Sequence, residues 1–283
     1  DRWIRSRLEA TLVQIEEAYE NFRFDLASQA LYDFIWNEFC DWYLELSKPV
    51  LWDESAKPAE QLAARQALVG VLEQSLRMLH PFMPFLTEEI WQTVSPLAGL
   101  QGDSIMLAPW PARCSDQIDT EAEQEIEWLK QIIVGIRTIR SESNIPPGNE
   151  LPVFFVNASS LERERLKRNE SYLGRLAKVS SIKVIESGED IPASLMALCG
   201  DLEVRVPMAG VIDVSAELSR LDKELARHEQ EITKLSGKLS NQAFIERAPT
   251  EVVEAEREKL AQAEVALVAV QRQRAQIEEL RSA

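Results

Sequence analysis

The sequence VSAELSRLDKELARHEQEITKLSGKL, residues 214–239, carries the clearest structural signal in the chain. Its apolar residues recur at alternating spacings of four and three, with one histidine in the series: Val214, Leu218, Leu221, Leu225, His228, Ile232, Leu235 and Leu239. This alternation is the heptad pattern of a coiled coil, in which one stripe of a helix packs against a partner helix. The stretch therefore predicts a long helix of about 40 Å that needs a second helix along its seam.

A matching seam follows after a break at residues 241–249 that ends in Ala248-Pro249. Its members are Val253, Leu260, Ala263, Leu267, Val270, Arg274 and Ile277. Two seams joined by a short loop predict an intramolecular antiparallel hairpin over residues 213–283. In this register Leu239 faces the start of the second helix, and Leu218 and Leu221 face the region of Arg274 and Ile277.

Basic residues of the first arm helix gather away from the predicted seam. Arg220, Arg227 and Lys234 are seven residues apart, and Lys223 lies beside them on the helix surface. Two interpretations stay open: a solvated coiled-coil surface, or a row of contacts to the phosphates of a nucleic acid. Arg247 falls at the predicted tip, where its guanidinium could reach a phosphate or stack on an exposed base.

The first third of the chain has the three-to-four residue apolar spacing of amphipathic helices. One such run begins at Ile4 and Leu8, and others follow over residues 31–46, 62–79 and 84–91. We expect a helical bundle over residues 1–112. The aromatic segment Phe34–Tyr43 could stack on unpaired bases, but the core spacing of Phe39, Trp42 and Tyr43 favours a role in packing.

The middle of the chain changes its period. A helix is predicted from about Thr120 to Ser143, then a strand at residues 151–156, a helix at 160–177, a strand at 182–185 and a hairpin over 195–206. Residues 113–212 are therefore expected to hold a long helix and a small α+β connector. Arg168 and Arg175, on the second of these helices, are further candidates for nucleic-acid contact. The predicted fold class is mainly α.

Composition limits the possible functions. The 283 residues include 31 Lys or Arg and 47 Asp or Glu, so the formal net charge is −16, which argues against nucleic-acid binding by bulk charge. Residues 215–283, with 11 basic and 13 acidic residues, would repel a polyanion least. Three scattered cysteines and two histidines make a metal site improbable, and no catalytic or nucleotide-binding motif occurs. No apolar run is long enough to cross a membrane.

Five stretches resemble one enzyme family. The stretch HPFMPFLTEEIW (80–91) is similar to a signature in the anticodon-binding helical domain of class I aminoacyl-tRNA synthetases for valine, isoleucine and leucine. The stretches DRWI (1–4) and FIWNEFCDWYLE (34–45), and IRSE (139–142) with IPPG (145–148), resemble the valine enzymes. Residues 218–280, with the loop NQAFIERAP (241–249), resemble the C-terminal coiled-coil arm of bacterial valyl-tRNA synthetases.

The resemblance implies the C-terminal part of a cytoplasmic, monomeric enzyme that uses ATP to join valine to tRNA(Val) and that edits mischarged threonine. Its catalytic and editing domains, and the first helix of its anticodon bundle, are not among these residues, and the chain lacks an initiator methionine. We therefore expect a fragment with no catalytic residue, cofactor or metal of its own. Its expected partners are tRNA(Val) and the N-terminal domains of the same polypeptide, with no membrane contact.

Two alternatives come from other classes or substrates. A coiled coil can also be a structural module that pairs with protein, and the net charge of −16 favours that interpretation on composition alone. The isoleucine–tRNA ligases are the nearest rival family. They usually end in a cysteine zinc module, which Cys40, Cys114 and Cys199 are too scattered to build.

Overall fold

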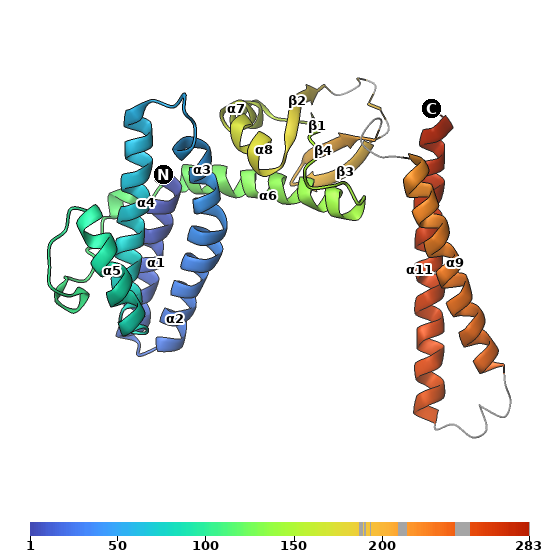
Figure 1. Cartoon of the computed structure of the whole chain (residues 1–283), viewed down its shortest axis with the longest axis horizontal. Coiled ribbons are helices and arrows are strands. Elements are labelled where there is room, and N and C mark those ends of the chain that lie inside the picture. Colours follow the sequence, from blue (N-terminus) through green and yellow to red (C-terminus); the bar gives the residue numbers. More distant parts are fainter. Residues whose placement is uncertain (187–188, 190, 193, 209–213, 241–249, 283) are drawn as a thin grey trace.

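The computed structural model describes residues 1–282 apart from 187–188, 190, 193, 209–213 and 241–249. A helical bundle, a small sheet with its helices and a two-helix arm follow one another along the molecule (Figure 1). The predicted fold class, mainly α with a small α+β unit and an antiparallel coiled-coil hairpin, is confirmed. In the part of the chain that the structure describes, no helix is long and apolar enough to span a membrane.

The bundle is built from the amphipathic runs of the first hundred residues. Its helices are α1 (Arg2–Glu20), α2 (Phe24–Tyr32), α3 (Leu44–Leu51), α4 (Pro58–Leu79) and α5 (Pro84–Leu97). Proline stands at the first position of both α4 and α5, where its missing N–H costs no helical hydrogen bond. The apolar face of α1, including Ile4, Leu12 and Ile15, is buried in the centre of the bundle.

A π-helix over Asp33–Tyr43 connects α2 to α3, so the chain stays helical from Phe24 to Leu51. The 3.6-residue period did not predict this wider helix. Pro49 lies inside α3, which ends two residues later at Leu51. The core assignment of the aromatic segment holds for Phe39 and Tyr43, which are buried. Trp36 instead lies largely exposed.

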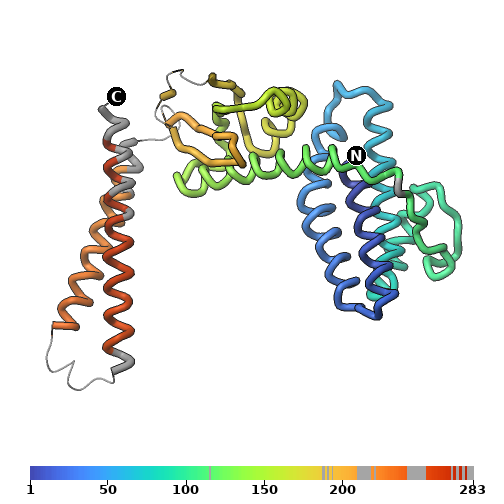
Figure 2. The backbone as a smooth tube through the Cα atoms, turned by 180° about the vertical axis from the view of Figure 1, so that it is seen from behind, coloured from blue at the N-terminus to red at the C-terminus, as the bar shows by residue number. Residues whose placement is uncertain are grey.

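Helix α6 (Thr120–Glu142) joins the bundle to the sheet (Figure 2). It contacts α1 as well as strands β3 and β4, and Ile132, Ile133 and Ile136 on its buried face are inaccessible to solvent. Gly135 lets β3 approach closely, because a Cβ there would lie 3.3 Å from the Cβ of Ala197 and from the sulfur of Cys199. One hydrophobic core therefore runs continuously from the bundle into the sheet.

The sheet has the strand order β2-β1-β4-β3, where the strands are β1 (Leu151–Val156), β2 (Val179–Ile185), β3 (Ser194–Cys199) and β4 (Leu202–Pro207). β1 and β2 are parallel and are connected through α7 (Ser160–Arg168) and α8 (Glu170–Leu176). The other pairs, β1 with β4 and β3 with β4, are antiparallel. The predicted hairpin is confirmed, with Gly200 at φ +63° in its turn.

The arm consists of α9 (Val214–Leu239) and α11 (Thr250–Ser282), which run antiparallel to each other (Figure 1). The predicted register is confirmed near the base, because Leu218 and Leu221 pack in one cluster with Val270. Near the other end, Lys238 pairs with Glu256 at 3.3 Å, which places the end of α9 beside the start of α11. The predicted tip, residues 244–249, lies outside the described residues.

Candidate nucleic-acid interface

A narrow apolar seam holds the two arm helices together. Leu218 and Leu221 on α9, and Val253, Ala263 and Val270 on α11, are buried. Leu195 and Met208 of the sheet pack against the base of this seam, so the cluster also fastens the arm to the connector. The remaining described surface of the arm is mostly exposed, as expected for two helices that cover only one stripe of each other.

Two ion pairs cross the seam and fix its register. Arg274 donates to Asp222 at 2.7 Å, and Lys238 lies 3.3 Å from Glu256. Hydrogen bonds from Lys259 and then Lys238 hold the pKa of Glu256 below its ordinary value. Glu256 occupies the seam position between Val253 and Leu260 and is buried. The apolar pattern did not predict it as a seam residue because its side chain is charged.

Both histidines contact neighbouring side chains of the fold. His228 has a mostly buried side chain, and its Nδ1 lies 3.9 Å from a carboxylate oxygen of Glu231. The other histidine, His80, follows the last residue of α4 and bonds through Nδ1 to the hydroxyl of Thr87 at 2.7 Å. Within the described ranges, no three His, Cys, Asp or Glu side chains are grouped so that they could hold a metal ion.

The basic stripe, defined here as Arg220, Lys223, Arg227 and Lys234, lies along α9. Lys223, Arg227 and Lys234 are exposed. None of these three side chains forms an ion pair with a residue that the structure describes, because no carboxylate oxygen of the described residues lies within 4.0 Å of their charged nitrogens. The side chain of Arg220 and the whole of Arg247 lie outside the described residues, so their candidacy remains a prediction.

The stripe differs from three other cations of the arm, which are paired. Arg274, Lys238 and Lys259 each contact a carboxylate of their own or the neighbouring helix. Arg257 on α11 is exposed and, in the described part of the chain, has no ion-pair partner; sequence reasoning missed it because it belongs to no repeat. Residues seven apart on a helix lie about 10.5 Å from each other along the axis, so the stripe presents regularly spaced charge.

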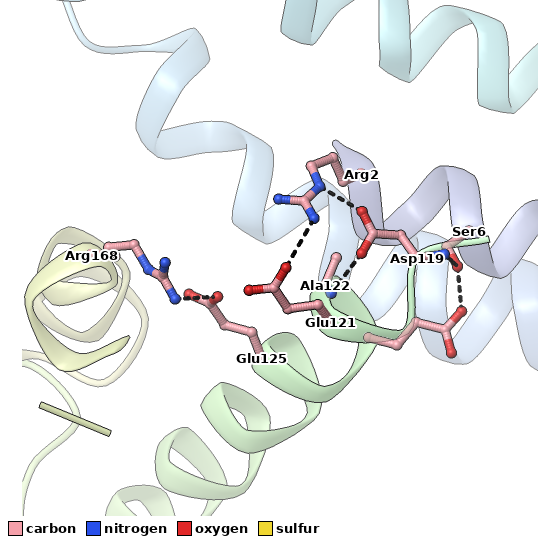
Figure 3. Close-up of polar contacts among 8 residues, drawn as sticks. Arg2, Ser6, Asp119, Glu121, Ala122, Glu125 and Arg168 are labelled. Atoms are coloured by element: carbon pink, nitrogen blue, oxygen red, sulfur yellow. Dashed lines mark hydrogen bonds and ion pairs between the residues drawn. The ribbon is translucent and has the colours of Figure 1, made fainter. Parts of the chain in front are cut away.

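The two candidates on the connector are engaged within the protein. Arg168 on α7 donates to Glu125 of α6 at 2.8 Å (Figure 3). The guanidinium of Arg175 on α8 lies 5.8 Å from the ring centroid of Trp52 in the bundle, a cation–π distance. Both residues thus connect neighbouring elements. Their helices, α7 and α8, lie beside the sheet, apart from α9 in the arm (Figure 1).

The arrangement on α9 suits contacts to a nucleic-acid backbone. Lysine and arginine without a protein carboxylate can replace the counterions of phosphates, and this interaction carries no sequence information. Holding a polyanion is therefore the function that its geometry supports.

Comparison with protein families agrees with this geometry. Residues 1–155 match the model for the anticodon-binding domain of tRNA ligase, and this match covers more than half of the chain. Residues 213–278 match the model for the valyl tRNA synthetase tRNA binding arm, the segment that carries the basic stripe. The chain therefore belongs to the tRNA ligases with this anticodon-binding domain, and its two matched regions are those of the C-terminal part of valyl-tRNA synthetases.

Proposed function

We propose that this chain is the tRNA-binding C-terminal region of a valine–tRNA ligase, an enzyme that charges tRNA(Val) with valine in an ATP-dependent reaction and edits its errors. One observation carries the proposal: the segment that matches a tRNA-binding arm is the coiled coil on which Lys223, Arg227 and Lys234 are exposed, with no ion pair to any residue that the structure describes. The family of that arm model supports valine as the amino acid. The rival assignments remain an isoleucine enzyme and a coiled coil that binds protein.

In this proposal the arm and the bundle divide the work. The arm holds the body of the tRNA by its phosphates and binds different tRNAs about equally, because its contacts go to the backbone. Discrimination among tRNAs falls to the anticodon-binding bundle. Arg168 and Arg175 are secondary candidates, since they already contact Glu125 and Trp52. Arg247 is also a secondary candidate, because it lies outside the described residues.

The chemistry of charging belongs to the rest of the parent enzyme. The 283 residues contain no recognisable ATP-binding or nucleophile motif, so the isolated chain is expected to show no aminoacylation, editing or ATP–pyrophosphate exchange. It is expected to need no cofactor and to act as part of a monomeric, cytoplasmic polypeptide. Valine-dependent pyrophosphate exchange by the purified chain would contradict this part of the proposal.

The proposal is tested by removing the stripe from the full-length ligase. Arg220→Ala, Arg227→Ala and Lys234→Ala are combined, and tRNA(Val) KM, kcat and ATP–pyrophosphate exchange are measured. We expect KM to rise at least tenfold, because each lost phosphate contact weakens binding. Exchange should stay at the wild-type rate, since that half-reaction requires no tRNA in this proposal.

The control removes cations from elsewhere on the protein. Lys167→Ala, Lys178→Ala and Lys183→Ala change the net charge by the same amount at exposed positions of the connector, outside both matched regions. Circular dichroism first establishes that the arm of the stripe variant is folded. If the stripe variant and this control have the same KM, the stripe is only a solvated surface. Preference of the wild-type enzyme for isoleucine over valine would instead favour the rival ligase.

A further inference from the structure

The bundle has an apolar groove that the tRNA-binding role does not use. It is a cavity of about 280 Å³ between the α2–π-helix junction and the turn from α4 to α5. Apart from Ser28 its lining residues are apolar or aromatic: Leu31, Tyr32, Ile35, Trp36, Leu79, Phe82 and Met83. Two of these residues, Ile35 and Trp36, belong to the aromatic segment 34–43, for which the sequence left base stacking and core packing as alternatives.

Large aromatic side chains are exposed along this groove and beyond its end. Tyr32 and Trp36, 57% and 56% exposed, stack with ring centroids 6.4 Å apart. Phe24 is 55% exposed and Phe85 is 91% exposed, and both lie close in sequence to residues that pack at the groove's end. Monomeric proteins rarely expose contiguous apolar surface on this scale unless it contacts a partner.

The turn between α1 and α2 holds a strained residue, two positions before Phe24. Phe22 has φ +56°, in the left-handed region that bulky residues seldom adopt, and its side chain is 80% exposed. Because the ring is exposed, its burial does not offset the energetic cost of the positive φ angle. Strained residues of this kind are often found at sites of contact with another molecule.

The charge around the groove excludes RNA as the natural occupant. The segments that line it, residues 24–43 and 79–83, contain no lysine or arginine. Of their four carboxylates, Glu38 pairs with Arg7 at 3.0 Å, whereas Asp33 and Asp41 have no ion pair to any residue that the structure describes. The nearest arginine in sequence, Arg23, already donates to both carboxylate oxygens of Asp25 at 2.9 and 2.6 Å. Nucleic-acid phosphates would find no counter-charge there, whereas a protein segment with lysine or arginine beside an apolar stripe would be complementary.

We propose that this groove, defined by Tyr32, Trp36, Phe82 and Met83, docks an amphipathic helix with basic flanks from another part of the same tRNA ligase polypeptide. The inference rests on the proposed function, which makes this chain one region of a larger enzyme. The apolar lining of the groove accepts apolar side chains of such a helix. Docking there would fix the bundle against the rest of the enzyme while the basic stripe on the arm stays free for tRNA.

Photocrosslinking in the full-length ligase tests the docking directly. Tyr32→p-benzoylphenylalanine and, in a second protein, Trp36→p-benzoylphenylalanine are irradiated in the presence of tRNA, and the adducts are mapped by mass spectrometry. Leu198→p-benzoylphenylalanine is the matched control, because Leu198 is an apolar side chain 65% exposed on β3. Mixing isotope-labelled and unlabelled enzyme separates adducts within one polypeptide from those between copies.

We expect both groove positions to crosslink to a basic amphipathic segment of the same polypeptide outside these 283 residues, at least fivefold above the control. Adducts with tRNA or between copies, adducts only within these residues, or yields no higher than the control would overturn the assignment. Valine charging is measured on the unmodified enzyme. Failure of charging refutes the proposed function, whereas normal charging without the crosslink refutes only the docking groove.

Discussion

The body of the molecule, residues 1–208, and its arm, α9 with α11, are stabilised in different ways. In the body a single core extends from the bundle along α6 into the sheet, with many side chains fully removed from solvent. In the arm a single stripe is buried, and ion pairs such as Arg274 with Asp222 accompany it. The body is thus expected to be the more stable part, and the arm the part that can open without it.

The same contrast separates structural from available charge. Buried Arg140 in α6 donates through Nη1 and Nη2 to the carbonyl oxygens of Pro146, Ala177 and Lys178. Its charged group is therefore bonded within the fold. Lys223 and Arg227 on the arm are exposed, and the described residues offer them no carboxylate at ion-pair distance. Cations that do not hold the fold together are the ones free to bind a polyanion.

The largest effect is expected from a charge placed in the arm's seam. Leu221→Asp would bury an unpaired carboxylate and should destabilise the arm by about 4 kcal/mol. All seven tryptophans lie between residues 3 and 128, so tryptophan fluorescence reports on the body, while far-UV circular dichroism reports on both parts. We expect the helical signal to fall with fluorescence unchanged. Coincident loss of both signals would mean that the arm and body form one cooperative unit.

Truncation of a buried side chain in α6 tests the stability of the body. Ile136→Ala removes a side chain that is fully buried where α6 meets the sheet, and should lower the body's free energy of unfolding by about 3 kcal/mol. The control Val134→Ala, at a half-exposed position, should change it by less than about 0.5 kcal/mol. Urea titration followed by fluorescence should show one transition. Two separate transitions for bundle and sheet would contradict the continuous core.

The buried guanidinium of the body has a smaller expected effect. Arg140→Met leaves carbonyl oxygens without their donors and should cost about 2 kcal/mol in urea titrations. Arg137→Met is the matched control on the same helix, because Arg137 is exposed, donates to the carbonyl of Leu176 and lies 5.9 Å from the ring centroid of Trp42. Equal effects of the two substitutions would show that burial does not distinguish these arginines.

The smallest effect concerns pH. Burial raises the pKa of Tyr43 to about 12 in the body, while an unfolded tyrosine titrates near pH 10. The unfolded state therefore loses its proton first, and the folded state loses stability as pH rises from 10 to 12. At pH 11, relative to pH 8, wild type should lose about 1 kcal/mol more than Tyr43→Phe. Parallel pH profiles for the two proteins would contradict the role of burial.

The sequence was informative where one period persists, and failed where geometry departs from it. Leu218 and Leu221 were placed in the seam by their spacing alone. The π-helix was missed because 3.6-residue periodicity cannot represent it, so Trp36 was not recognised as lining a groove. Glu256 was skipped because a carboxylate in a seam depends on a cation from the other helix, and that pairing requires the three-dimensional register.

The candidate site shows the same limits. Heptad spacing alone predicted that Lys223, Arg227 and Lys234 share an exposed surface, because position in a coiled coil determines exposure. It could not predict that Arg168 would reach Glu125 or that Arg175 would lie over Trp52, since these partners are far away in sequence. Contacts between separate elements decide which cations remain available.

The central claim, that free cations on α9 hold tRNA by its backbone, is tested most directly by salt dependence. The tRNA Kd of the 283-residue chain is measured between about 50 and 200 mM salt for wild type and for the Arg220→Ala, Arg227→Ala, Lys234→Ala variant. We predict that the slope of log affinity against log salt falls by about two to three units in the variant, at equal arm helicity. An unchanged affinity and slope would contradict the claim.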